Sequence, residues 1–394
     1  MSVADRVSKG DVIAFRLGAH HLIERLGENG LLEAAGRCGI QNSPPGSALL
    51  ALHARVRDLT PERLADAVAG EKSLLQTWCM RGAPFYFPAA DAPIFTTGVL
   101  PPTEAARRHF VRGVGPALDT LGMSLTETVE LTGAELHAVL SGRRLAITEL
   151  GAELARRIAR RLPQRQRDLW EAAGPYAPDQ PLGEGVVHFC LRILTLQRVV
   201  CFAPRAGNTA PFVLVDEWLG QPIPDFDPEA ARAELLRRYG PSTRGDFAAW
   251  AGLRARDTDP WWRPVQDELA PVDFGGASWI LTEDLDALRS APTPAGVRLL
   301  PPRDPYTQLR DRETIVDKQY HREVWKTVGE PGAVLVDGEI AGIWRPRTSG
   351  RKLTITVETF GTLPDRDKQL LQHEAEQVAP LRGAASVDVQ FATS

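Results

Sequence analysis

Apolar residues recur at helical spacing along most of the chain up to Ser290. The clearest example lies between residues 147 and 162, where Leu150, Leu154, Ile158 and Leu162 fall on one face at intervals of four. Such a stripe predicts an amphipathic helix whose apolar face packs against a core.

Short helices are followed by an apolar strand pair in three places, which is the order of a winged helix. In the first place, Thr60 and Pro61 carry the signals of a helix start. Leu74–Met80 is expected to be the recognition helix, and the strand Phe85–Phe87 is expected to belong to the wing.

The second unit begins at Thr132, which opens a capping box for a helix at Leu136–Leu140. After two further helices, the strands Val199–Phe202 and Phe212–Val215 form its wing. The third unit has a helix capped by Asp227 and another capped by Ser242 or Thr243. Its expected wing consists of Val272–Phe274 and Ser278–Leu281 across a Gly275-Gly276 turn.

Strand patterns dominate after Arg298. Val334–Val336, Glu339–Arg345 and Leu353–Phe360 predict an antiparallel meander, which a helix and a last strand at Ser386–Phe391 follow. This part of the chain is expected to form a small α+β or barrel-like domain.

A chain of 394 residues is longer than one hydrophobic core usually covers. We therefore expect an α+β protein of four modules, three of them winged helices. The expected boundaries are 1–100 for the first winged helix, 101–220 for the second, 221–296 for the third and 297–394 for the C-terminal domain.

The overall charge gives little support to indiscriminate nucleic-acid binding, because the net value is −4. Only six of the 46 basic residues are lysines. The planar guanidinium of arginine binds phosphate in a bidentate manner, which the ammonium of lysine cannot do. A high-GC genome produces the same excess of arginine over lysine, however, and is the simpler explanation. One hairpin, from Arg345 through Arg347 and Arg351 to Lys352, contains no acid, and it forms either a solubilising edge or a DNA contact.

Four cysteines lie among apolar neighbours without C-x-x-C spacing, which predicts buried, reduced thiols and no metal site. They are Cys38, Cys79, Cys190 and Cys201. The polar first ten residues and the absence of a run of 18 apolar residues argue against secretion and membrane insertion. A cytoplasmic location is therefore expected.

One stretch, Gly39–Gly46, places three uncharged polar side chains between two helical segments. The Pro-Pro-Gly cluster at its end cannot continue a helix. If the backbone is extended here, Gln41 and Ser43 point to the same side and Asn42 to the other. The simplest interpretation is a turn whose polar groups satisfy the backbone. The alternative is a catalytic turn.

Several short motifs in a fixed order resemble those of a known family and cover the chain from about residue 12 to 391. They are Gly39-Ile40-Gln41, Thr77-Trp78-Cys79-Met80-Arg81-Gly82, Gly240-Pro241-Ser242-Thr243-Arg244-Gly245-Asp246-Phe247, Leu299-Leu300-Pro301-Pro302-Arg303-Asp304-Pro305-Tyr306, Asp311-Arg312 and Asp337-Gly338-Glu339-Ile340-Ala341-Gly342-Ile343-Trp344. This set resembles the AlkZ-like winged-helix DNA glycosylases. The resemblance implies tandem winged helices that form a concave cradle, completed by a β-barrel domain.

The resemblance also implies a function, namely excision of bulky alkylated bases, chiefly N7-substituted guanine. Gln41 matches the first glutamine of the family's motif, which is Gln-x-Gln or, in one branch, Gln-x-Asp, whereas the second polar position falls on Ser43. The partner of Gln41 is therefore Ser43, Asn42 or neither. Implied DNA contacts are Trp78, Arg81 and the basic hairpin. The expected partner is double-stranded DNA carrying alkylated bases, bound by a monomer that needs neither cofactor nor metal.

Self-resistance to a DNA-alkylating natural product is the biological role that this resemblance suggests. A monofunctional mechanism is expected because the helical modules contain only two lysines, Lys9 and Lys72. The competing hypothesis is a winged-helix regulator that binds DNA without chemistry. A regulator would normally be a dimer with one recognition helix per half-site.

Overall fold

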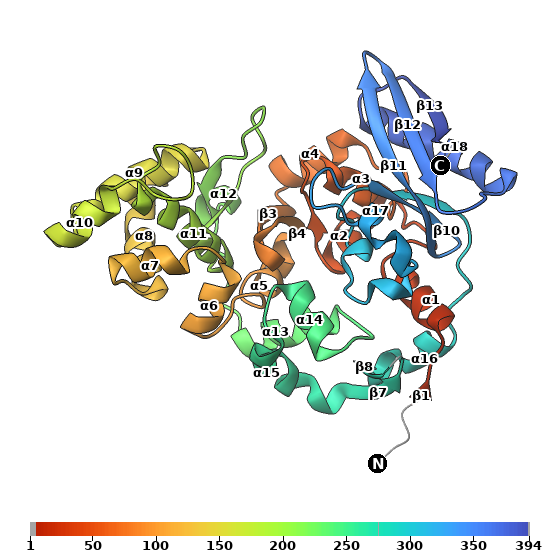
Figure 1. Cartoon of the computed structure of the whole chain (residues 1–394), viewed down its shortest axis with the longest axis horizontal. Helices are drawn as coiled ribbons and strands as arrows, with labels where there is room; N and C mark the ends of the chain where they lie inside the picture. The colour runs from red at the N-terminus through yellow and green to blue at the C-terminus, as the bar shows by residue number, and fades with distance from the viewer. Residues whose placement is uncertain (1–4, 275, 393–394) are drawn as a thin grey trace. The chain divides into compact units, whose positions relative to one another are not determined.

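The computed structural model describes residues 5–274 and 276–392, and Figure 1 shows its helices and strands. The chain divides into two compact units, each assembled from separate stretches of the sequence. The first comprises Met1–Leu64, Arg237–Trp250 and Val265–Ser394, and the second comprises Ala65–Leu236 and Ala251–Pro264. Helices and strands alternate in both units, so the predicted α+β class is confirmed. The division into four modules, the winged helices and the concave cradle stay predictions.

A five-stranded sheet forms the C-terminal part of the first unit. In spatial order its strands are β13 (Ser386–Ala392), β12 (Lys352–Thr359), β11 (Glu339–Ser349), β10 (Gly332–Val336) and β9 (Val297–Leu300). The strands β9 to β12 are antiparallel, which confirms the predicted meander, and β13 joins β12 in parallel. Helix α18 (Asp365–Leu381) packs on this sheet (Figure 1), where its Leu371 and Val378 share a core with Trp344 and Ile355.

The expected barrel is not what this domain forms. Its sheet is open, with β13 and β9 at its two edges, and among the described residues no pairing joins these edges. Helix α18, together with Leu50, covers the apolar side of the sheet, so closure into a barrel is not needed to shield Leu353 or Val357 from solvent.

The first unit also contains the N-terminal helix α1 (Lys9–Ala19) and further helices and strands. They are β1 (Asp5–Arg6), α2 (Leu31–Gly36), β2 (Ile40–Gln41), α3 (Ser47–His53), α14 (Arg244–Ala251), β7 (Leu269–Asp273), β8 (Ala277–Leu281), α16 (Leu285–Arg289) and α17 (His321–Val324). The strands β1, β7 and β8 form a small sheet, and Val12 of α1 packs against Val272 and Ile280 on it. The predicted third strand pair is therefore present, whereas Gly275 of its turn lies outside the described residues.

Helices dominate the second unit. They are α4 (Pro61–Ala69), which begins in the first unit, α5 (Ala92–Phe95), α6 (Glu104–Phe110), α7 (Gly115–Leu121), α8 (Leu125–Leu140), α9 (Ile147–Ala159), α10 (Gln164–Glu171), α11 (Leu182–Leu196), α12 (Val215–Leu219), α13 (Pro228–Arg237) and α15 (Asp259–Trp262). Strands β4 (Pro84–Pro88), β3 (Leu74–Trp78), β5 (Val200–Phe202) and β6 (Phe212–Leu214) lie in this order within one sheet. The predicted stripe on α9 is confirmed, since Leu150, Leu154 and Ile158 are fully buried.

The predicted recognition helix Leu74–Met80 is wrong, because residues 74–78 form strand β3. This strand pairs along its length with β4, from Leu74 opposite Pro88 to Trp78 opposite Pro84, and also contacts β5 through Gln76. A short apolar run fits a helix or a buried strand equally well, and here the tertiary pairing decides.

The capping box at Thr132 is also wrong, because α8 runs without a break from Leu125 to Leu140. Ser124 caps this helix by accepting a hydrogen bond from the backbone N–H of Glu127 at 3.0 Å. Thr132 lies inside the helix, and its hydroxyl donates to the carbonyl oxygen of Thr128 at 2.7 Å. The helix therefore begins at Leu125 after its cap Ser124, and the capping-box sequence at Thr132 does not begin a helix.

All four cysteines are buried and unpaired with one another, as predicted. Burial raises the pKa of Cys38 to about 11 and the pKa values of Cys79 and Cys190 to about 12. Burial likewise raises the pKa of Cys201. Within the described residues, no helix is both long and apolar enough to span a bilayer.

Substitution of Gly332 by alanine is expected to destabilise the C-terminal sheet. A Cβ atom at this position of β10 would meet the Trp344 indole and lie 2.6 Å from the carbonyl oxygen of Leu300. Neither neighbour is the flexible end of a side chain, so we expect a loss of about 2 kcal/mol in the free energy of unfolding. Gly361→Ala is the control, because no atom lies within 4 Å of the added Cβ. Equal denaturant midpoints for the two variants would contradict this packing argument.

Candidate active site

The predicted catalytic turn lies between two helices of the first unit, as the proline cluster required. Gln41 is the last residue of the short strand β2. It lies five residues after the end of α2 and six residues before Ser47, the first residue of α3. Its backbone is extended, and its carbonyl oxygen accepts a hydrogen bond from the Ser47 hydroxyl at 3.2 Å. Gln41 is only 4% exposed, so its carboxamide has little contact with solvent.

Asn42 serves the turn itself. Its Oδ1 atom accepts hydrogen bonds from the backbone N–H groups of Gly46 at 2.9 Å and Ala48 at 3.4 Å. Gly46 has a positive φ of 89°, which favours glycine at this position. These contacts match the simpler interpretation of the motif for this residue: the Asn42 side chain closes the loop and starts α3.

Ser43 contacts a residue that the sequence interpretation did not single out. The Ser43 hydroxyl accepts a hydrogen bond from Nη1 of Arg303 at 3.1 Å. Nε of the same guanidinium donates to Oε2 of Glu330 at 3.2 Å. Ser43 is half-buried and the Arg303 side chain is 39% exposed, so this part of the turn is accessible to a ligand. An uncharged hydroxyl and a charged donor thus meet beside the predicted motif.

A buried ion pair fixes the loop that carries Arg303. Asp304 binds Arg55 in a bidentate manner, with both N–O distances at 2.8 Å, and both side chains are almost completely buried. Arg55 Nη1 also donates to the carbonyl oxygen of Ala51, and the backbone N–H of Tyr306 donates to Asp304. Burial opposes the charge of Arg55, but the attraction of Asp304 outweighs it and raises the Arg55 pKa.

His20 lies behind this ion pair in the core. It is 7% exposed, its ring meets the edge of Tyr306 at a centroid distance of 5.8 Å, and its Nδ1 lies 3.7 Å from the Cys38 sulfur. Burial first, and then the charges of Arg55 and Arg37, lower the pKa of His20 well below the ordinary value. His20 is therefore a neutral, packed histidine rather than a proton donor.

Within residues 5–274 and 276–392, no cluster of three or more His, Cys, Asp or Glu side chains is arranged to hold a metal ion. The groups around the turn are instead a carboxamide, a hydroxyl and a guanidinium. A carboxamide both donates and accepts hydrogen bonds without changing charge, and a hydroxyl does the same. Such groups can orient a water molecule and a polar substrate.

Comparison with known proteins decides the family. A profile of the family described as DNA glycosylase AlkZ-like matches residues 35–381. This chain belongs to the AlkZ-like DNA glycosylase family.

The fold agrees with this assignment. The structure is similar to that of Streptomyces sahachiroi DNA glycosylase AlkZ, with a TM-score of 0.76 and 24% sequence identity. The match covers 98% of this chain and 100% of that chain. A search of the curated proteins finds no match. Membership of the AlkZ-like family implies DNA as the substrate and supports glycosylase activity.

The four basic residues of the hairpin in this AlkZ-like chain differ in whether they have a polar partner. Arg345 donates to the carbonyl oxygen of Gly329 at 2.8 Å, and Lys352 forms an ion pair of 3.2 Å with Asp388 of the neighbouring strand β13. Arg347 and Arg351 are exposed at the tip, and neither side chain has a polar partner among the residues that the structure describes. The acid that the hairpin sequence lacks is therefore supplied by β13, but only to Lys352.

Trp78 and Arg81 belong to the second unit and do not share a helix. Trp78 ends strand β3, where Phe202 meets its ring edge-on at 5.2 Å and the Arg192 guanidinium lies 5.4 Å from its centroid. Arg81 follows with a positive φ of 57°, and its guanidinium lies 5.6 Å from the Phe85 ring. Both side chains are half-buried. They stay predicted DNA contacts.

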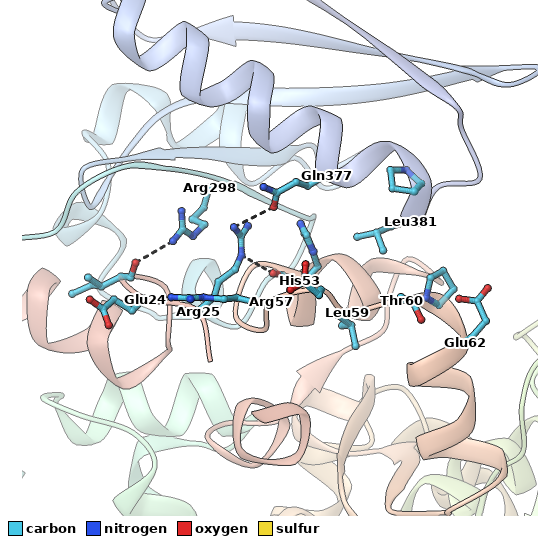
Figure 2. A pocket seen from close by; sticks show the side chains of 14 residues that line it. Glu24, Arg25, His53, Arg57, Leu59, Thr60, Glu62, Arg298, Gln377 and Leu381 are labelled. Atoms are coloured by element: carbon cyan, nitrogen blue, oxygen red, sulfur yellow. Dashed lines mark hydrogen bonds between the residues drawn. The ribbon is translucent and has the colours of Figure 1, made fainter. Parts of the chain in front are cut away.

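A cavity of about 910 Å³ opens elsewhere in the first unit, between the start of α4 and the C-terminal end of α18 (Figure 2). None of the predicted site residues lines it. Figure 2 shows Arg25 bonded to Gln377 and to the backbone of His53, and Arg25 also pairs with Glu374 at 2.7 Å. Arg298 reaches the same carboxylate at 3.6 Å, so Glu374 neutralises much of the positive charge here.

His53 borders this cavity, is 6% exposed, and has no hydrogen-bond partner for either ring nitrogen within the described residues. Burial, followed by the charges of Arg25 and Arg298, lowers its pKa to about 4. An unfolded chain binds a proton here below about pH 6.5, whereas the folded chain does so only near pH 4. The ring is therefore neutral in the folded protein near pH 7.

The free energy of unfolding is accordingly expected to fall as the pH falls from about 6.5 to about 4, and His53 contributes about 3 kcal/mol to this loss. Unfolding at a series of pH values should show a shallower decrease for His53→Gln than for the wild type. His373→Gln is the control, because His373 is exposed on α18. Equal slopes for wild type and His53→Gln would contradict the depressed pKa.

Asp304→Ala is expected to lower the free energy of unfolding by about 3–5 kcal/mol, because it leaves the Arg55 charge buried without a partner. The double variant Arg55→Met/Asp304→Leu should be more stable than Asp304→Ala, since it removes both charges. Lys318→Ala is the control: its ion pair with Glu313 is exposed on both sides and should contribute less than about 1 kcal/mol. If Asp304→Ala costs no more than Lys318→Ala, the ion pair does not hold the loop.

Proposed function

We propose that this chain is a monofunctional DNA glycosylase that hydrolyses the N-glycosidic bond of bulky, N7-alkylated guanine in double-stranded DNA. The observation that carries the proposal is the family match, which includes Gln41 in an extended turn between two helices. The chain acts as a monomer, and its role is self-resistance to a DNA-alkylating natural product. The replacement of the family's second glutamine by Ser43 favours such a specialised role.

The chemistry of this substrate suits a site without a carboxylic acid. Breaking an N-glycosidic bond builds oxocarbenium character on the sugar, and the leaving base usually needs a proton. A guanine alkylated at N7 already carries a positive charge and departs as a neutral base. What remains is to place a water molecule near C1′ and to stabilise the developing charge.

Gln41 is the residue proposed to do this, through the oxygen of its carboxamide. Because Gln41 is 4% exposed in the free chain, the proposal requires that its carboxamide becomes more accessible when DNA binds. Ser43 is its proposed partner, since its hydroxyl is half-buried and oriented by Arg303. Asn42 contributes indirectly, by closing the turn.

A monofunctional reaction is supported by the contacts of the two lysines in the helical modules. Lys9 forms an ion pair with Glu339 at 3.1 Å, and the Lys72 ammonium lies 5.0 Å from the centroid of the Trp218 ring. A Schiff-base mechanism would need an uncharged lysine amine next to the sugar. Borohydride trapping of an enzyme–DNA adduct would contradict this part of the proposal.

DNA contacts are proposed for Trp78, Arg81, Arg345, Arg347, Arg351 and Lys352. The two exposed arginines at the hairpin tip, Arg347 and Arg351, are the strongest of these because their guanidinium groups can reach phosphates at no cost to the fold. Lys352 would first have to exchange Asp388 for a phosphate.

Gln41→Ala is expected to slow the release of N7-methylguanine from duplex DNA by about 100-fold under single-turnover conditions. The affinity of Gln41→Ala for a duplex with a tetrahydrofuran abasic analogue in place of the lesion should change little, because the basic hairpin of the protein is intact. Gln372→Ala, on the outer surface of α18, is the matched control and should behave as wild type. Release at the wild-type rate by Gln41→Ala would show that the site is misplaced. Binding without any release by the wild type would instead favour a DNA-binding regulator.

A further inference from the structure

Arg303 is held in an uncommon backbone conformation next to the candidate site. Its φ is 60°, in the left-handed region that arginine rarely adopts. Other non-glycine residues of the chain share this conformation, but Arg303 is the one whose side chain bonds to Ser43. Strain of this kind persists only where the surroundings impose it, and it is often found at functional sites.

The surroundings that impose it are clear. The next residue, Asp304, is locked by Arg55 through two bonds of 2.8 Å, and its backbone N–H donates to the carbonyl oxygen of Pro301 at 3.2 Å. Arg303 therefore has little freedom to move its backbone. Its side chain is directed to Ser43 on one side and to Glu330 on the other.

We propose that Arg303 is a positioning residue for the glycosylase reaction, which orients the Ser43 hydroxyl while Glu330 balances its charge. This inference rests on the proposed function, because Ser43 is taken as the partner of Gln41. It assigns a role to two residues, Arg303 and Glu330, that the Gln-x-Gln comparison does not include.

The chemistry of the hydroxyl explains how Arg303 acts. A serine hydroxyl has one proton to donate and two lone pairs, whereas a guanidinium only donates and is always charged. Arg303 occupies one lone pair of Ser43, so the hydroxyl proton must point elsewhere. The hydroxyl is then preset to donate to a lone pair of a water molecule and so to orient it, and the adjacent charge makes it a stronger donor.

Glu330 solves the electrostatic problem that this arrangement creates. A lone positive charge near the sugar would oppose the oxocarbenium character of the transition state. The Glu330 carboxylate, 3.2 Å from Nε of Arg303, makes the pair neutral overall. Glu330 is also close to the charges of Arg310 and Arg312. Arg312 also makes a cation–π contact with Trp325, whose ring centroid lies 4.3 Å from the guanidinium carbon.

The pH dependence of the reaction follows from the same geometry. Burial raises the pKa of Glu330 above the ordinary value of 4.5, against the opposing effects of Arg303 and Arg312. As the pH falls, Glu330 becomes neutral at a higher pH than an exposed glutamate would. Below that pH, the Arg303 charge is uncompensated and the reaction should slow.

The test uses the full chain and a duplex containing N7-methylguanine, with single-turnover release measured at saturating enzyme. We expect Ser43→Ala and Arg303→Ala each to slow release by about 10-fold. The double variant should be no slower than Ser43→Ala, because Arg303 acts through Ser43. Arg303→Lys should recover only part of the rate, since an ammonium lacks the planar fork that serves both partners.

Two further measurements separate positioning from a structural role. Glu330→Gln should slow release and lose the acid limb of the pH profile that the wild type shows. Glu313→Gln is the control, because its ion pair with Lys318 is exposed, and it should keep that limb. The proposal is overturned if the Arg303→Ala and Ser43→Ala effects multiply, or if Arg303→Ala weakens DNA binding and leaves the single-turnover rate unchanged.

A binding measurement distinguishes this proposal from the proposed function. The probes are duplexes with a cationic pyrrolidine or a neutral tetrahydrofuran abasic analogue. Wild type should prefer the cationic analogue, and Glu330→Gln should reduce this preference by about 10-fold. If wild type releases no base but Glu330→Gln still removes the preference, the proposed function fails and the charge balance stands. If Gln41→Ala is inactive while Arg303→Ala and Glu330→Gln match wild type, the positioning role fails alone.

Discussion

The buried ion pair of Arg55 and Asp304 is the constraint on which the candidate site depends. It joins the end of α3 to the loop after β9, two segments separated by 249 positions in the chain. Each ion also bonds to a backbone group, and such additional hydrogen bonds help a core to tolerate a buried ion pair. With Asp304 fixed, the backbone of Arg303 is held as well, and its guanidinium lies within hydrogen-bond distance of Ser43 in the candidate turn.

The local features of the fold could be predicted from the sequence. Thr60 and Asp227 cap their helices as expected, and the meander follows from alternation and from the turn at Asp337-Gly338. The hydrophobic pattern gave a wrong prediction where the same apolar run fits both a helix and a strand. Leu74–Trp78 is apolar enough for either state, and only its partners β4 and β5, one of them far along the chain, make it a strand.

The same limit applies to the site. The break between helices at Gly39–Gly46 is a local property of proline and glycine, so the place of Gln41 and the role of Asn42 in closing the turn could be anticipated. The contact between Ser43 and Arg303 spans 260 positions, and nothing in the spacing of either motif indicates it. The C-terminal sheet gives a second example of a contact that the sequence does not indicate. Asp388 reaches Lys352 because β13 pairs with β12 in parallel.

The burial of the four cysteines has a consequence for how this protein reacts with electrophiles. Sulfur attacks electrophiles as the thiolate, and burial holds the pKa of each thiol well above neutral pH. The core thus keeps its softest nucleophiles protonated and out of reach of small reactive compounds. A protein of this design keeps its thiols unreactive in the presence of electrophilic compounds, DNA-alkylating agents among them.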